Sequence, residues 1–197
     1  MYYDKFTRLL HWCFALMIPL QLLSEELMKR PKPGRVRDEM QVFFFDMHEW
    51  VGMLLLAVIV LRFAWAFISK EFSVQRLYPY MFASRRPGLL KEIKQVPSWF
   101  KGKLSDLNSN EYYLAGAVHG LGLLLVLAMG ITGAMMLYGM AESGLMTGII
   151  HEAKEVHEAL GGLLWAYLIA HVGMTIIHKL AGHHLLRRIF SLTSSAQ

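Results

Sequence analysis

Residues 156–181 read VHEALGGLLWAYLIAHVGMTIIHKLA, and this stretch decides how the rest of the chain is interpreted. It carries no acidic or basic side chain from Ala159 through His178, a length close to the roughly 20 apolar residues with which a helix spans a bilayer. Its histidines 157 and 171 are 14 residues apart, nearly four helical turns. They therefore lie within about 40° of one face and roughly 21 Å apart along the axis. The sequence predicts a membrane-spanning helix with one imidazole at each of two depths.

Three earlier segments have a similar length and apolarity. With the first stretch they give predicted spans at about 6–27, 47–69, 112–141 and 156–181, and nothing left over is long enough for a separate folded domain. Hydrophobic residues make up 55% of the 197-residue chain, which is more typical of a membrane bundle than of a soluble domain. We therefore expect an all-α fold, an integral membrane four-helix up-and-down bundle, with residues 1–197 forming a single transmembrane domain.

The distribution of basic residues predicts how the bundle is oriented. Most lie between the second and third spans and in the C-terminal tail, and the positive-inside rule places those segments in the cytoplasm. Since the number of spans is even, both termini are expected there. The net charge of +5 indicates contact with anionic membrane lipid and no nucleic-acid partner. Apolar residues alternate with lysines over 89–103, which predicts a short helix on the membrane surface that Pro97 ends.

Five of the nine histidines, His11, His48, His119, His157 and His171, lie well within the spans or at their starts, where ionisable side chains are costly and usually functional, and His178 lies near the end of the fourth span. Imidazole is a common ligand of haem iron, and two imidazoles fill both axial positions, which favours electron transfer. By depth, His48 pairs with His157 at the outer end and His11 with His171 at the inner end. Cys13 is the only cysteine, which excludes covalent attachment of haem through a C-x-x-C-H motif. We therefore expect two non-covalent haem b groups with these four histidines as iron ligands.

Five other residues are candidate parts of the same sites. Gly52 and Gly161 each follow a predicted ligand by one turn and either make room for a porphyrin or serve ordinary helix packing. Arg62 lies 14 residues after the ligand of its helix, and it either pairs with a haem propionate or extends to lipid phosphate. His119 is a possible replacement ligand at the inner haem or a quinone-site or second-sphere residue. His178 either borders a quinone head group or a propionate, or is an interfacial histidine without a functional role.

Three segments of the chain match a known pattern: RLLHW at 8–12, MHE at 47–49 with Gly52 and the pair LR at 61–62, and VHEAL at 156–160 followed by His171. With them the whole chain resembles the bacterial cytochrome b561 family. That family includes cytochrome b subunits of hydrogenases and formate dehydrogenases and the single-subunit superoxide oxidases. The resemblance implies haem ligands on the first, second and fourth helices, which favours His11 over His119 as a ligand. It also implies a multi-pass protein of the bacterial inner membrane.

The resemblance implies an oxidoreductase component that exchanges electrons with ubiquinone or menaquinone. Its redox partner is expected to be a periplasmic dehydrogenase subunit or a soluble cytochrome. One alternative is an enzyme acting alone, which oxidises superoxide at the outer face and reduces ubiquinone. An alternative of another class is a haem-free transporter whose histidines bind metal or relay protons. A four-ligand metal site needs clustered ligands, however, and His157 and His171 are too far apart along one helix to share one.

Overall fold

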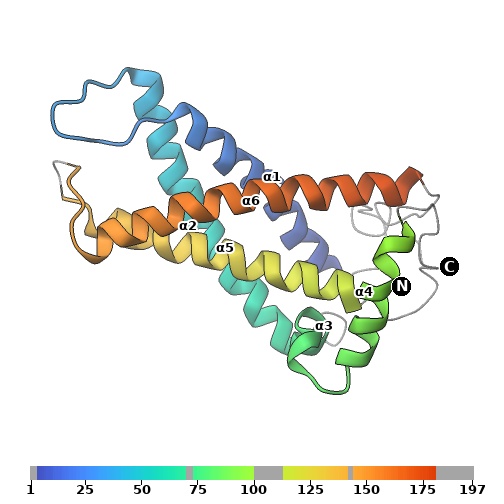
Figure 1. The fold of residues 1–197 in the computed structure, drawn as a ribbon. Helices are drawn as coiled ribbons and strands as arrows, with labels where there is room; N and C mark the ends of the chain where they lie inside the picture. Colours follow the sequence, from blue (N-terminus) through green and yellow to red (C-terminus); the bar gives the residue numbers. More distant parts are fainter. Residues whose placement is uncertain (1–3, 70–72, 100–112, 142–143, 181–197) are drawn as a thin grey trace. The chain divides into compact units, whose positions relative to one another are not determined.

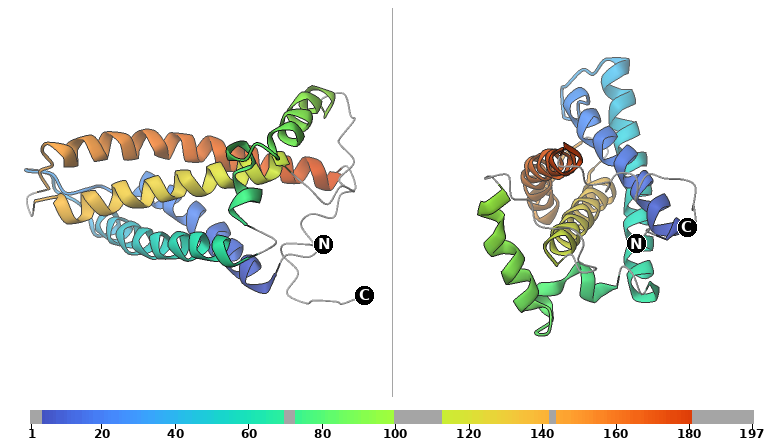
Figure 2. Two further views of the ribbon diagram at one scale, coloured as in Figure 1. Left: turned by 90° about the horizontal axis from the view of Figure 1, so that it is seen from below. Right: turned by 90° about the vertical axis from the view of Figure 1, so that its right-hand side faces the viewer.

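The computed structural model of the chain describes residues 4–69, 73–99, 113–141 and 144–180 (Figure 1). All the regular secondary structure in the described residues is helical. The elements, which Figure 2 follows from two further directions, are α1 (Lys5–Leu27), α2 (Glu39–Ile68), α3 (Val74–Leu77), the 3-10 helix η1 (Pro79–Met81), α4 (Arg86–Trp99), α5 (Tyr113–Gly139) and α6 (Ile149–Leu180). Residues 112 and 181, at which two predicted spans begin or end, lie outside the described residues.

Four of these helices, α1, α2, α5 and α6, are long and apolar enough to cross a membrane. The predicted all-α fold with four spans is thereby confirmed. Two helices start earlier than the sequence indicates: α2 begins at Glu39 and α6 at Ile149. Both helices have polar contacts near their starts. Asp38 accepts a hydrogen bond from the amide of Gln41 over 2.8 Å, and α6 has charged pairs one turn apart.

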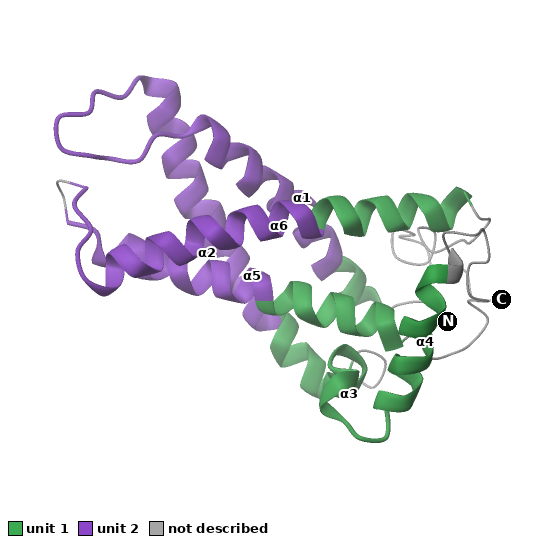
Figure 3. Ribbon diagram, viewed as in Figure 1, with its two compact units in different colours: residues 1–9, 62–124, 168–197 green, residues 10–61, 125–167 purple. Residues whose placement is uncertain are grey.

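The chain divides into two compact units, which Figure 3 shows in different colours. Unit 1 contains Met1–Leu9, Arg62–Leu124 and Leu168–Gln197, and unit 2 contains Leu10–Leu61 and Leu125–Tyr167. Every long helix contributes a segment to both units. Each unit therefore holds one end of α1, α2, α5 and α6, and each is described by itself below.

In unit 2 the helices approach one another at glycines. Gly52 of α2 lies against Gln21 of α1, whose amide nitrogen is 2.9 Å from the position that a Cβ would take. Gly130 of α5 packs in the same way against the side chain of Leu56 in α2. Small residues at such contacts let helix backbones come close together within a membrane, where helix association depends on packing.

In unit 1 the short helix α3 packs directly on α5. Gly116 and Gly120 of α5 lie against the backbone carbonyls of Arg76 and Leu77, so closely that a Cβ at either glycine would overlap the carbonyl oxygen. Leu77 also belongs to a buried cluster with Ala66 of α2. These contacts hold the segment between α2 and α4 against the membrane helices.

A side chain of α4 supplies hydrogen-bond acceptors to the start of α5. The Glu92 carboxylate accepts hydrogen bonds from the amides of Tyr113, over 3.2 Å, and Leu114, over 2.6 Å. The first amides of a helix have no partner within the helix itself. Glu92 supplies that partner for α5 from a different helix.

The prediction that Pro97 ends this surface helix is wrong, because α4 continues through it to Trp99. A proline lacks one amide hydrogen, and so near a helix end it removes only one bond of the final turn. Leu90 and Ile93 are exposed on α4 beside lysines, which is the pattern of a helix that contacts the membrane surface.

Candidate functional site

The structure brings His48 of α2 and His157 of α6 together within unit 2. Their ring centres are 6.4 Å apart and the ring planes are inclined at 75°. A bond from a metal to an imidazole nitrogen is about 2 Å long, and that nitrogen lies about 1 Å from its ring centre. Two imidazoles on opposite sides of one metal ion therefore have centres roughly 6 Å apart. The pair has the separation of two axial ligands of a single iron.

The protonation of the His48 ring follows from its hydrogen bonds. Its Nδ1 lies 2.9 Å from the hydroxyl oxygen of Ser24, which in turn lies 2.8 Å from the carbonyl oxygen of Gln21. A carbonyl can only accept, and a hydroxyl has a single proton to donate. Ser24 thus donates to Gln21 and accepts from Nδ1–H of His48. The Nε2 atom of His48 is then the nitrogen with the free lone pair.

The same reasoning applies to His157. Its Nδ1 lies 2.8 Å from the hydroxyl oxygen of Thr132, which lies 2.8 Å from the carbonyl oxygen of Ala128. Thr132 donates to that carbonyl and accepts from Nδ1–H of His157. Both rings therefore present an unprotonated Nε2, the form in which a neutral imidazole binds a metal ion.

Three glycines surround this pair, and they differ in what a side chain would meet. A Cβ on Gly133 of α5 would lie 3.3 Å from Cε1 of His157. Gly161 is buried, yet a Cβ built there would contact no atom within 4 Å. The space at Gly52 is taken by the Gln21 amide. Two imidazoles with ring centres 6.4 Å apart, with a buried glycine beside open space one turn from His157, fit a haem.

A second pair of histidines lies in unit 1. The ring centres of His119 in α5 and His171 in α6 are 5.2 Å apart. Nδ1 of His119 donates to the carbonyl oxygen of Ala115 over 2.6 Å, which leaves its Nε2 unprotonated. The separation is about 1 Å shorter than two ligands across one iron require, so His119 fits a neighbour of His171 better than a second axial ligand. His11 belongs to unit 2, and its pairing with His171 stays a prediction.

Arg62 is buried in α2, with 5% of its surface exposed. Within unit 1 its charge interacts with the phenol of Tyr78 and the carboxylate of Asp4. Burial raises the pKa of Tyr78 to about 12, and the nearby Tyr80 acts in the same direction. A haem propionate as partner of Arg62 stays a prediction. So does a quinone role for His178, which is half-buried in the last turn of α6.

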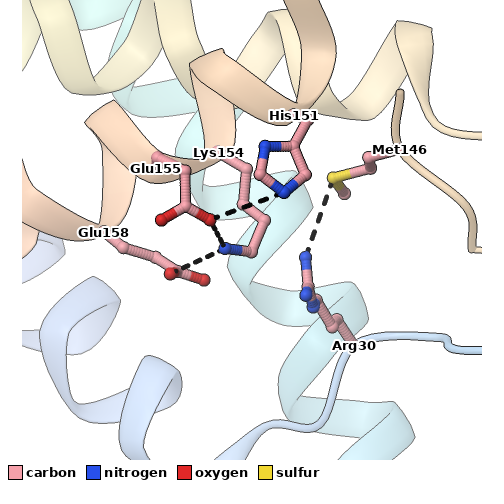
Figure 4. A network of polar contacts seen from close by, with 6 residues as sticks. All are labelled: Arg30, Met146, His151, Lys154, Glu155 and Glu158. Atoms are coloured by element: carbon pink, nitrogen blue, oxygen red, sulfur yellow. Dashed lines mark hydrogen bonds and ion pairs between the residues drawn. The ribbon is translucent and has the colours of Figure 1, made fainter. Parts of the chain in front are cut away.

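A charged network lies at the start of α6 in unit 2 (Figure 4). Lys154 donates to the carboxylates of Glu155 and Glu158, and His151 lies 3.9 Å from Glu155. Arg30 approaches the sulfur of Met146 at 3.8 Å. Nearly all of the Lys154 side chain is covered, so its charge is held in place by its two carboxylate partners.

Next to this network is a cavity of about 260 Å³ that basic side chains line. Arg30, Lys32, His151 and Lys154 contribute to its wall, with Pro33, Gly144, Leu145 and Met146 completing it. None of these lining residues is acidic. Repulsion from Arg30 and Arg35 lowers the pKa of Lys32.

Sequence reasoning missed the hydroxyl residues Ser24 and Thr132 and this basic cavity. The signal for the hydroxyls was a polar side chain in an otherwise apolar span. The signal for the cavity was a run of basic residues after the first span, but its partners on α6 lie more than 100 residues later in the chain.

Comparison with known proteins gives one finding about the chain as a whole. The family model for prokaryotic cytochrome b561 matches residues 2–192. No curated protein and no solved structure matches the chain. A cytochrome b of the membrane carries haem b and transfers electrons, in agreement with the four candidate spans. The chain belongs to the prokaryotic cytochrome b561 family.

Proposed function

We propose that the chain carries electrons across the membrane between the quinone pool and a redox partner through two haem b groups. His48 and His157 hold one haem, and His11 and His171 hold the other. The observation that carries the proposal is the His48–His157 pair, with ring centres 6.4 Å apart and both Nδ1 atoms bound to hydroxyls. When bound, a haem with two imidazole ligands supplies a one-electron couple and leaves no axial position for oxygen.

The other pair of histidines supports a quinone site. A quinone that takes up two electrons also takes up two protons, so its site needs groups that exchange protons with it. His119 has an unprotonated Nε2 beside His171, which suits a hydrogen bond from a quinol hydroxyl. His178 is on the same helix as His171, seven residues further on. We assign His119 and His178 to quinone, ubiquinone or menaquinone, and Arg62 to a propionate.

The basic segments support an orientation with both termini in the cytoplasm of a bacterium and the protein in its inner membrane. In that orientation the ends of α2 and α6 that carry His48 and His157 face outwards. The electron partner at this face would be a periplasmic dehydrogenase subunit or a soluble cytochrome. We also propose that residues 1–197 work as a single di-haem domain.

Haem stoichiometry tests the proposal. A pyridine haemochrome assay on purified protein should give two haems per chain. Alanine at His48 or at His157 should remove one haem and leave the other spectrally unchanged, while His119→Ala should keep both. The matched control is His151→Ala, six residues before His157 on the same helix, which should keep both haems. One haem per wild-type chain, or protein without a reducible Soret band, would contradict the proposal.

The basic cavity favours a second candidate, a stand-alone superoxide:ubiquinone oxidoreductase. Superoxide is a monoanion, and Arg30 and Lys32 offer positive charge in unit 2, which also contains His157. Each superoxide would give up one electron and leave as O2, and two of them with two protons would convert one quinone to quinol. Stopped-flow mixing with superoxide, compared with a quinol, separates the two functions. A chain that quinol reduces and superoxide does not is an electron carrier only.

A haem-free transporter has less support. Among the residues that the structure describes, no three His, Cys, Asp or Glu side chains form a group that could hold a metal ion. The membrane histidines meet in pairs instead, as in His48 with His157. A zinc or proton flux assay in vesicles, run on protein with its haem content measured, tests this alternative directly.

A further inference from the structure

We propose that Ser24 and Thr132 are positioning residues of the His48–His157 centre. Their hydroxyls hold the two imidazoles in the tautomer that offers Nε2 to iron, and they increase the electron donation of both ligands. The inference rests on the proposed function, since it concerns the haem that these histidines hold. It goes beyond that function by assigning a role to two residues, Ser24 and Thr132, that contact the histidine ligands and neither the iron nor a substrate.

Ser24 forms one link of a three-membered chain on α1 and α2. Nδ1–H of His48 donates to the Ser24 hydroxyl over 2.9 Å, and that hydroxyl donates to the Gln21 carbonyl over 2.8 Å. Only 1% of Ser24 is exposed, so water does not compete for these bonds. The side-chain amide of Gln21 also donates to the backbone carbonyl of His48 over 2.9 Å. One turn of α1 thereby fixes both the ring and the backbone of this ligand.

Thr132 holds the other ligand from α5. Its hydroxyl donates to the carbonyl of Ala128, one turn earlier on its own helix, and lies 3.1 Å from that of Met129. A threonine side chain is stiff at χ1, so these backbone contacts aim the oxygen lone pair in a fixed direction. Nδ1–H of His157 meets that lone pair over 2.8 Å. The ligands thus come from α2 and α6, and their supports come from α1 and α5.

The direction of the effect follows from ligand chemistry. An acceptor at Nδ1–H makes an imidazole a stronger donor to its metal, and a stronger donor stabilises ferric over ferrous iron. Each hydroxyl therefore lowers the reduction potential of this centre. A hydroxyl is neutral, so the effect is smaller than a carboxylate would give. Removing either hydroxyl should raise the potential of this haem alone.

The test uses the purified haem-loaded chain with Ser24→Ala and Thr132→Val, which remove the hydroxyls with little change of volume. At a fixed solution potential, each should increase the ratio of reduced to oxidised haem at this centre by threefold to tenfold. This equals roughly 30 to 60 mV at 59 mV per tenfold. Redox titration measures this ratio. The electron paramagnetic resonance of the ferric haem reports the accompanying change in the ligands' electron donation. Thr132→Ser, which keeps the hydroxyl, should restore the wild-type values.

Thr175→Val is the matched control. The Thr175 hydroxyl donates to the backbone carbonyl of His171 over 2.8 Å, away from both ligands of the His48–His157 centre, so its removal should leave that centre unchanged. Selective loss of this haem from Ser24→Ala or Thr132→Val also supports the proposal. Equal loss of both haems, or unchanged potential and resonance in both variants, contradicts it. Wild-type chain without haem contradicts the proposed function instead.

Discussion

Replacing Gly161 with alanine should separate the stability of the helices from their ability to hold haem. A Cβ at this buried glycine would contact no atom within 4 Å. Alanine in place of glycine inside a helix favours folding by about 1 kcal/mol. We place a porphyrin beside His157, where the new methyl group would overfill the space at a cost of about 1 to 3 kcal/mol. Haem binding should then weaken roughly fivefold to 150-fold.

The matched control is Gly162→Ala, on the same helix, where a Cβ also contacts nothing within 4 Å but the residue is exposed. Both variants should melt at least as high as wild type when haem is limiting. Transfer of haem to excess apomyoglobin, followed by Soret absorbance, measures haem retention, and only Gly161→Ala should release haem faster. Equal release from the two variants would refute the placement of the porphyrin beside Gly161.

Three further predictions concern unit 1. Burial acts to raise the pKa of Asp4, but hydrogen bonds from the amide and hydroxyl of Thr7, over 2.8 and 2.6 Å, hold it below its ordinary value of 3.8. Asp4→Ala should therefore cost about 1 kcal/mol at neutral pH, and the deficit in melting temperature should vanish as the pH falls through that lowered pKa. The pKa of Tyr78 rises from 10.0 to about 12 through burial, with Tyr80 adding to the effect, so stability should decline as the pH rises from 10 to 12. Tyr78→Phe should remove that decline in thermal melts at alkaline pH. Glu92→Ala should lower stability by about 1 to 3 kcal/mol, because two amides of α5 lose their acceptor, and an unchanged melting temperature would show that water replaces it.

Hydropathy was enough to predict the four spans, because a lipid environment tolerates few charges. It failed at the starts of α2 and α6, where the helix continues beyond the apolar stretch. Near the start of α6, Lys154 and Glu158 pair one turn apart, and the i,i+4 spacing itself favours the helix. A hydropathy count does not include the stabilisation of a helix by such a charge pair. Chain direction also placed His48 level with His157, and their ring centres are indeed 6.4 Å apart.

The supporting hydroxyls could not be predicted in the same way. A serine or threonine in a membrane helix usually bonds its own backbone, as Thr132 does with Ala128. Whether the same oxygen also meets an imidazole of another helix depends on how the two helices are rotated about their axes. The closeness of His119 to His171 depends on the same rotation. Spacing along a single chain segment contains no information about it.

The Glu92 carboxylate couples the position of α4 to the first turn of α5. Because Glu92 of α4 accepts hydrogen bonds from the first amides of α5, the position of α4 and the first turn of α5 are linked. A displacement of α4 must break the two hydrogen bonds to the Glu92 carboxylate. The amides in the first turn of α5 then lose their acceptor. That turn begins at Tyr113, six residues before His119, so a displacement of α4 would act close to this imidazole in the sequence of α5.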